Sequence, residues 1–124
     1  MDAPVFDHVE LGILGHCVED YCGSTELLWA LQRLTPGLTN RAVLVRRGVD
    51  ILERFLTEQL IAAYVKTGDA TAPFSPAPEA VEELLAVVER EHVISPETPS
   101  AQRYWFAATP DGVARYFEAQ QQAS

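Results

Sequence analysis

Two cysteines and the histidines near them are the residues whose chemistry would first suggest a metal site or a nucleophile. Cys17 follows His16 directly, and Cys22 and His8 lie in the same N-terminal stretch. Structural zinc sites usually take paired ligands, such as two cysteines separated by two residues, with a second pair further along the chain. Adjacent residues of a helix point about 100° apart, and the sequence has no second pair. We therefore expect no metal site and two free thiols, the usual state of cysteine in a reducing compartment.

Other motifs of catalysis are missing from the sequence. Cys17 falls on the apolar side of its predicted helix, where a free cysteine is usually buried and unreactive. The chain contains no phosphate-binding loop, dinucleotide glycine motif, serine nucleophile elbow or metalloprotease helix. With no candidate catalytic residue and no implied cofactor, we expect this protein not to be an enzyme.

Four glutamates in the second half of the chain form a candidate binding surface, which we call the acidic ridge: Glu79, Glu82, Glu83 and Glu89. Their spacings of three, four and seven residues place them on one face of a predicted helix. None of them has a lysine or arginine four residues later in that helix. Two interpretations stay open. The ridge is either a solubilising face or a patch that docks a basic protein through charge complementarity.

A band of arginines in the middle of the chain is the feature that would suit DNA. Asn40 and Arg41 begin a predicted helix, and Arg46 and Arg47 lie on its outer face. Arg46 has Asp50 four residues later, so pairing within the helix is expected to neutralise this face. Only Asn40 and Arg41 could reach base edges from the first turn, whereas a reading helix usually uses three or four side chains. DNA binding through these four residues is the alternative hypothesis.

Length and charge bound the classes of function. The 124 residues are enough for one domain with a core, and 48% of them are hydrophobic. The formal net charge of −9 disfavours nucleic acid, whose binding depends on neutralising phosphates. No apolar stretch approaches the roughly 18 residues of a membrane helix, and Asp2 and Asp7 interrupt any signal-peptide pattern. We therefore expect a cytoplasmic protein that does not enter the membrane.

Apolar spacing, capping residues and turn signals predict the elements that must position these side chains. Helices are predicted over residues 9–21, 25–34, 41–60 and 79–91, with a last helix after Thr109. Strands are predicted over residues 61–65 and 103–108, and a loop over residues 66–78. Ser24 is the expected N-cap of the second helix. The expected fold class is mostly α with a small antiparallel β-ribbon, in a single domain spanning residues 1–124.

The segment YWFAATPDGVARYF, near the end of the chain, predicts a strand that turns into a helix. Thr109 can cap this helix, Pro110 suits its first position, and Asp111 meets the positive end of the helix dipole. Trp105 alternates with the aromatic residues on either side of it, so they must face the opposite way. The large aromatic side chains are all expected in the core: Trp29, Tyr104, Trp105, Phe106 and Phe117.

This order of elements resembles the winged helix-turn-helix superfamily, in the style of MarR-like and PadR-like regulators. The segment ILERFLTEQLIAAYV looks like the end of a third helix that runs into the wing. AATPDG looks like the turn that follows the return strand of the wing. The resemblance implies a winged-helix-like domain in which residues 66–102 form a helix-containing insertion between the two wing strands.

Charge and the missing catalytic motifs favour a binding protein over an enzyme. The expected function is a non-enzymatic acidic module that binds a basic protein partner, similar to the immunity proteins and antitoxins that neutralise basic toxins. The alternative, implied by the resemblance, is a winged-helix transcriptional regulator that dimerises through its terminal helices.

Overall fold

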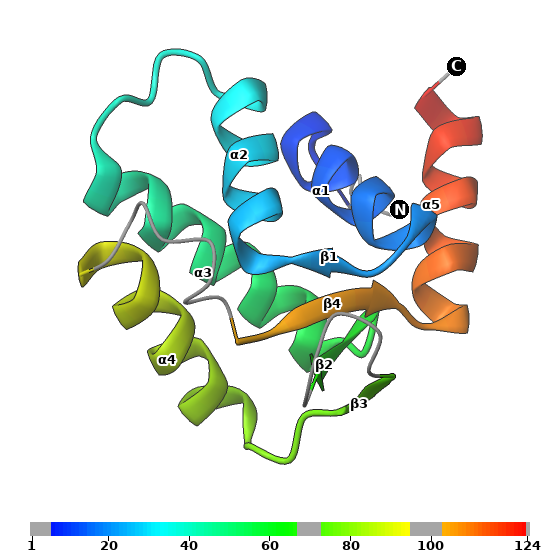
Figure 1. Cartoon of the computed structure of the whole chain (residues 1–124). Coiled ribbons are helices and arrows are strands. Elements are labelled where there is room, and N and C mark those ends of the chain that lie inside the picture. Colours follow the sequence, from blue (N-terminus) through cyan, green and yellow to red (C-terminus); the bar gives the residue numbers. More distant parts are fainter. Residues whose placement is uncertain (1–5, 67–72, 95–102, 124) are drawn as a thin grey trace.

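Five helices and a four-stranded sheet make up the part of the chain that the structure, a computed structural model, describes: residues 6–66, 73–94 and 103–123 (Figure 1). In chain order the elements are α1 (His8–Glu19), β1 (Cys22–Gly23), α2 (Ser24–Leu34), α3 (Arg41–Thr57), β2 (Ile61–Lys66), β3 (Phe74–Pro76), α4 (Val81–Ile94), β4 (Trp105–Ala108) and α5 (Pro110–Ala123). The predicted fold class, a mostly α domain with a small antiparallel sheet, is confirmed.

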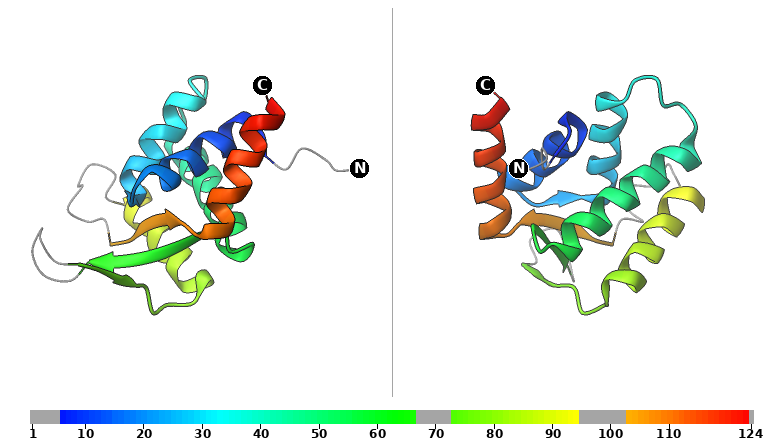
Figure 2. Two further views of the ribbon diagram at one scale, coloured as in Figure 1. Left: turned by 90° about the vertical axis from the view of Figure 1, so that its right-hand side faces the viewer. Right: turned by 180° about the vertical axis from the view of Figure 1, so that it is seen from behind.

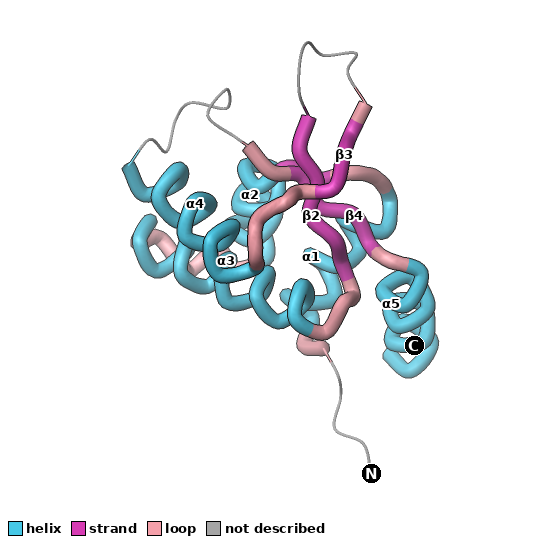
Figure 3. The backbone as a smooth tube through the Cα atoms, turned by 90° about the horizontal axis from the view of Figure 1, so that it is seen from below, coloured by secondary structure: helices cyan, strands magenta, loops and turns pink. Residues whose placement is uncertain are grey.

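All strands of the sheet are antiparallel to their neighbours, in the order β1-β4-β2-β3. Successive side chains of a strand point to opposite faces, and directly paired residues share a face. Phe106 of β4 pairs with Cys22 and with Ala63, and this set faces the helices because Phe106 and Cys22 are buried. Trp105 and Tyr64 form the neighbouring pair and face away. Figure 3, seen from below, looks toward the β3 edge of the sheet, and no described helix crosses in front of the strands in this view.

The hydrophobic core lies between the inner face of the sheet and the helices. α1 packs between α2 and α5, as both views of Figure 2 show, while α3 packs against α2 and α4. Phe55, Tyr104 and Phe106 are fully buried, so the predicted burial of Tyr104 and Phe106 is confirmed. The predicted burial of Trp29 and Phe117 is wrong, because these rings are 50% and 52% exposed on the outer sides of α2 and α5.

The start of α2 differs from the prediction. Ser24 was expected to be the N-cap, but Gly23 takes that position and Ser24 is the first residue of the helix. The N–H of Gly23 donates to the Glu26 carboxylate, 2.7 Å away, which satisfies one of the backbone groups at this end. The Ser24 hydroxyl is thereby left to bond within the core, where it meets His92.

α3 ends at Thr57, earlier than the predicted residue 60. Gln59 has a φ of 60°, in the left-handed region. The N–H groups of Gln59 and Leu60 donate back to the carbonyls of Leu56 and Phe55, at 3.1 and 2.8 Å. These two bonds form the Schellman motif that closes many helices. The left-handed position is usually glycine, so nothing in the sequence marked this end.

Two short strands are additions to the predicted elements. β1 falls in the break predicted between the first two helices, and β3 falls in the predicted loop 66–78. β3 and α4 both come from the segment between β2 and β4, where the resemblance placed an insertion. The helix-rich arrangement with its small antiparallel sheet is compatible with a winged-helix-like fold.

The predicted corner between β4 and α5 is confirmed, and it also joins two distant parts of the chain. The N–H of Gly112 donates to the Thr109 hydroxyl at 3.0 Å, and Pro110 begins the helix. The same hydroxyl donates to the carbonyl of Gln59 at 2.7 Å, and the Thr109 N–H donates to the carbonyl of Leu60 at 3.0 Å. A side chain on Gly112 would overlap that Leu60 carbonyl. Thr109 therefore fastens the start of α5 to the end of α3.

Replacing Thr109 with alanine should lower the free energy of unfolding by about 1–2 kcal/mol. The change removes the helix cap and leaves the Gln59 carbonyl without its donor. Urea unfolding followed by circular dichroism measures the loss. Thr109→Ser keeps the hydroxyl and should recover most of the stability. Equal destabilisation by both variants would mean that the methyl group, and not the hydrogen bonds, stabilises the corner.

Candidate protein-binding surface

Four aromatic side chains cover the outer face of the sheet, and we call them the aromatic face: Tyr21, Tyr64, Phe74 and Trp105. Tyr21 stacks on Phe74 with ring centroids 4.0 Å apart and planes inclined by 13°. Tyr21 meets Tyr64 edge-on at 5.1 Å, and Phe74 meets Trp105 at 5.6 Å. Such ring pairs attract one another beyond the gain from burial alone. The four rings therefore form one cluster.

Sheet register brings these rings together from distant parts of the chain. Tyr64 of β2 pairs directly with Trp105 of β4, and Phe74 lies on β3, on the other side of β2. β1 places Gly23 opposite Trp105 and so adds no side chain there. The ring of Tyr21, the residue just before β1, contacts Tyr64 of β2 and Phe74 of β3, the opposite edge strand. The cluster thus spans the whole width of the sheet.

The aromatic face is partly open to solvent and bears charges of both signs. Tyr21 is 41% exposed, and the other three rings are half-buried. Lys66 Nζ lies 4.8 Å from the centroid of the Phe74 ring, a cation–π contact. The exposed Asp20 carboxylate accepts the N–H of Tyr21 at 2.7 Å, so negative charge lies at the border of the cluster.

The sequence indicated only part of this surface. Trp105 alternates with Tyr104 and Phe106 as predicted, but its ring lies outside the core. Tyr64 and Trp105 could have been recognised as outward positions of the two predicted strands. Tyr21 and Phe74 could not, because the strands β1 and β3 that align them were not predicted.

The acidic ridge is divided in the structure. Glu82 and Glu83 are exposed in the first turn of α4, where the helix dipole favours negative charge. Glu89 is held by the neighbouring helix, because its carboxylate lies 3.2 Å from the Arg46 guanidinium of α3. Glu79 precedes the helix instead of belonging to it. Glu82 and Glu83 are therefore the two members that stand together at the surface.

Glu79 belongs more to the interior than to the ridge. It is half-buried, and its Oε1 atom is enclosed without a hydrogen-bond partner among the described residues. The carboxylate lies beside the buried hydroxyl of Tyr104, whose pKa is raised by burial and further by Glu79. This position makes Glu79 a poor candidate for contact with a partner.

Acidic side chains neutralise the outer face of α3. Arg46 lies between Asp50, at 2.9 Å, and Glu89, at 3.2 Å. Arg47 pairs with Asp7 across a distance of 3.4 Å. These exposed pairs contribute little to stability. They do neutralise the positive charge that binding to a DNA phosphate would require. The pairing expected from the sequence between Arg46 and Asp50 is confirmed.

The other two residues of the DNA-binding hypothesis also have structural roles. The Asn40 side chain caps α3 by accepting the N–H of Val43 at 3.1 Å. Arg41 is half-buried, and its Nε donates to the backbone carbonyl of His92 at 3.4 Å. The four candidate DNA-binding side chains are thus all engaged within the protein.

A buried serine–histidine pair links α2 to α4. His92 Nε2 lies 2.8 Å from Ser24 Oγ, and the two residues are only 4% and 1% exposed. Burial lowers the pKa of His92, and the Arg41 guanidinium lowers it further, so the imidazole is neutral at pH 7. A serine beside a histidine can act as a nucleophile with its base. Here both groups lie inside the core, where they form a structural hydrogen bond.

Both cysteines are free and buried. Burial, with smaller contributions from the carboxylates of Glu26 and Asp20, raises the pKa of Cys22 to about 12. Burial likewise raises the pKa of the Cys17 thiol. Thiols that stay protonated are poor nucleophiles and poor metal ligands. Among the residues the structure describes, no group of three or more His, Cys, Asp or Glu side chains could hold a metal ion.

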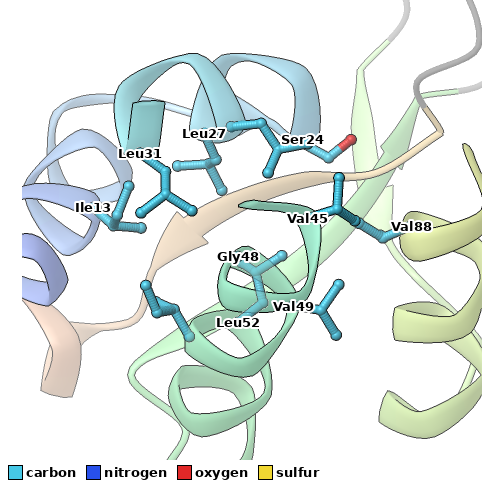
Figure 4. A pocket seen from close by; sticks show the side chains of 11 residues that line it. Ile13, Ser24, Leu27, Leu31, Val45, Gly48, Val49, Leu52 and Val88 are labelled. Atoms are coloured by element: carbon cyan, nitrogen blue, oxygen red, sulfur yellow. The ribbon is translucent and has the colours of Figure 1, made fainter. Parts of the chain in front are cut away.

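An apolar cavity between α2 and α3 is too small for a ligand (Figure 4). Its volume is about 20 Å³, close to the space that one water molecule needs. Ser24 is a polar residue in its wall, and its hydroxyl is engaged by His92. The remaining walls are hydrocarbon from side chains such as Leu27, Leu31 and Leu52. A water would find too few partners there, so the cavity is a dry packing defect.

Comparison with known proteins identifies no relative, since no family profile, no curated protein and no solved structure matches the chain. No helix in the described part of the chain has the length and apolar character to cross a membrane. Function must therefore be inferred from the surface of the chain itself.

The buried His92 should make the free energy of unfolding depend on pH. Its pKa is lowered in the folded state, so the unfolded chain binds a proton more readily. The stability that neutral His92 contributes is present above about pH 6.5, the value for an unfolded histidine, and is lost as the pH falls below it. His92→Gln can still form a hydrogen bond with Ser24 but cannot be protonated. It should lose less stability than the wild type between about pH 8 and pH 5.5.

Urea unfolding at the two pH values measures the difference for each protein. His8→Gln removes an exposed histidine from α1 and should keep the wild-type difference. If His92→Gln loses as much stability on acidification as the wild type, other groups cause the pH dependence.

Proposed function

We propose that this protein is a non-enzymatic module that binds a basic protein partner through the aromatic face of its sheet. The observation that carries the proposal is the mutual contact of four aromatic rings on the outer face of the sheet, all of them at least partly exposed to solvent. Protein interfaces are enriched in tyrosine, tryptophan and phenylalanine, and a few such residues supply most of the binding energy. A contiguous apolar patch on a protein surface commonly marks an interaction site.

The charge of the chain favours a basic partner. The formal net charge is −9, and Asp20 borders the aromatic face. Glu82 and Glu83 lie exposed at the start of α4, the helix that follows β3 in the chain. An apolar centre with a polar rim is the usual construction of an interface, and opposite charges speed the encounter and disfavour acidic competitors. Immunity proteins and antitoxins that neutralise basic toxins are the class whose chemistry fits best.

Trp105→Ala should prevent capture of the partner, because it removes a ring from the middle of the aromatic face. Affinity purification with the tagged protein from its source cells, run in parallel with wild type and variant, measures capture. Trp29→Ala removes an equally large, 50% exposed ring from α2 and should leave capture unchanged. If Trp29→Ala loses the partner and Trp105→Ala retains it, the interface lies on the helices and the proposal fails.

Association kinetics with the captured protein test whether Glu82 and Glu83 take part in binding. Reversing charge with Glu82→Lys and Glu83→Lys should slow association by roughly ten- to a hundredfold at low salt, the leverage of electrostatic steering. Glu53→Lys with Glu118→Lys changes the net charge equally at exposed positions on α3 and α5. Equal slowing by both pairs would assign the effect to net charge, and no slowing by the first pair would remove Glu82 and Glu83 from the interface.

A winged-helix transcriptional regulator is the alternative function, favoured by the order and arrangement of the elements. Its DNA contacts would come from the Asn40, Arg41, Arg46 and Arg47 side chains, which are engaged within the protein. We therefore expect no binding to duplex DNA tighter than about 10⁻⁴ M at physiological salt, the weak end of non-specific affinity. Micromolar binding in a mobility-shift titration, weakening steeply with salt, would favour the regulator.

A further inference from the structure

The aromatic face already holds one cation, which comes from this chain itself. Lys66 Nζ lies 4.8 Å from the centroid of the Phe74 ring, within the roughly 6 Å over which a ring attracts a positive charge. Lys66 pairs directly with Phe74 in the sheet, and its side chain shares the outer face with Tyr64. The Lys66 ammonium group thus shows that these rings can hold a positively charged side chain.

Ring surface remains for a second cation. Tyr21 is 41% exposed and Trp105 is half-buried, and tryptophan attracts cations more strongly than the other aromatic side chains. Stacking of Tyr21 on Phe74 at 4.0 Å fills the space between those two rings. A further cation must therefore lie on the open side of the cluster and not between the rings.

Negative charge next to the cluster favours the same kind of ligand. The Asp20 carboxylate is exposed and accepts the N–H of Tyr21, and Glu19 beside it is also exposed. Within a chain of formal net charge −9, these carboxylates add electrostatic attraction to that of the rings. A polyanion would meet repulsion at the same place.

We infer that the aromatic face binds an arginine side chain of the partner, beside Lys66 or in its place. This inference rests on the proposed function and names the chemistry that its surface recognises. A guanidinium group is planar, is less strongly hydrated than an ammonium and stacks well on aromatic rings, so arginine is preferred to lysine. Lys66 carries the same sign of charge and competes with the arginine for the rings.

Two matched peptides test the inference on the wild-type protein. One alternates glycine and arginine, and the other replaces each arginine with citrulline, which has nearly the same shape but no charge. A nuclear magnetic resonance titration follows the indole N–H signals of Trp105 and Trp29. The arginine peptide should shift the Trp105 signal until it saturates, and it should bind roughly two- to fivefold more tightly than the citrulline peptide. The Trp29 signal, from the exposed ring on α2, should stay in place.

Lys66→Gln separates competition at the rings from general attraction. This variant should bind the arginine peptide more tightly than the wild type, because it removes the internal cation. Arg90→Gln removes the same charge from an exposed position on α4 and should leave the affinity closer to that of the wild type. Equal effects of the two variants would mean that only net charge matters and would overturn the inference.

Three further results would overturn the inference. They are equal affinity for the two peptides, equal shifts at both indoles, and tighter binding of oligothymidylate than of the arginine peptide. The last result would identify a stacking surface for single-stranded nucleic acid. Equal peptide affinities leave the proposed function standing, since the rings can dock a partner through apolar contact alone. The proposed function fails separately, when Trp105→Ala leaves capture of the partner unchanged.

Discussion

The hydrogen bonds of Thr109 help to fix the register between β2 and β4, and the outward placement of Tyr64 and Trp105 depends on that register. β2 begins immediately after Leu60 and β4 ends immediately before Thr109, so their bond closes the end of the ladder at which Ile61 pairs with Ala108. A slip of one residue in a strand turns all of its side chains to the other face. Such a slip would carry Trp105 into the core and Phe106 out of it. The aromatic face thus depends on a corner at the far end of its strands.

The segment between β2 and β4 contributes to the surface as well as to the fold. β3 supplies Phe74, which contacts both Tyr21 and Trp105, and α4 supplies the exposed Glu82 and Glu83. A ribbon of β2 and β4 alone would present only two of the four rings. The same segment brings Glu89 against Arg46 and so neutralises part of α3. This segment therefore contributes to the proposed binding surface and balances charge on the helix that DNA recognition would require.

Local signals predicted the helices, the two longer strands and the Thr109 corner, because capping and apolar spacing act within a few residues. The end of α3 escaped prediction because Gln59 adopts a conformation that usually needs glycine. The aromatic face was not predicted because the strands β1 and β3 are only two and three residues long and are defined only by their pairing partners. Trp29 was wrongly predicted to be buried, because the size and apolar character of a side chain do not show whether its face of the helix packs against another element. Contacts between distant segments carried the information that the sequence lacked.

Gly112 gives this junction a signature that evolution should preserve. The position has no room for even one carbon beyond the backbone, because the carbonyl oxygen of Leu60 occupies that space. Exposed aromatic and acidic residues can be substituted as a binding partner changes. A homologue that keeps this junction, however, must keep the glycine. A sequence search can therefore use a short pattern: an aromatic strand followed by threonine, proline and glycine at positions 109, 110 and 112. Such a pattern should find remote homologues whose overall sequence identity is low.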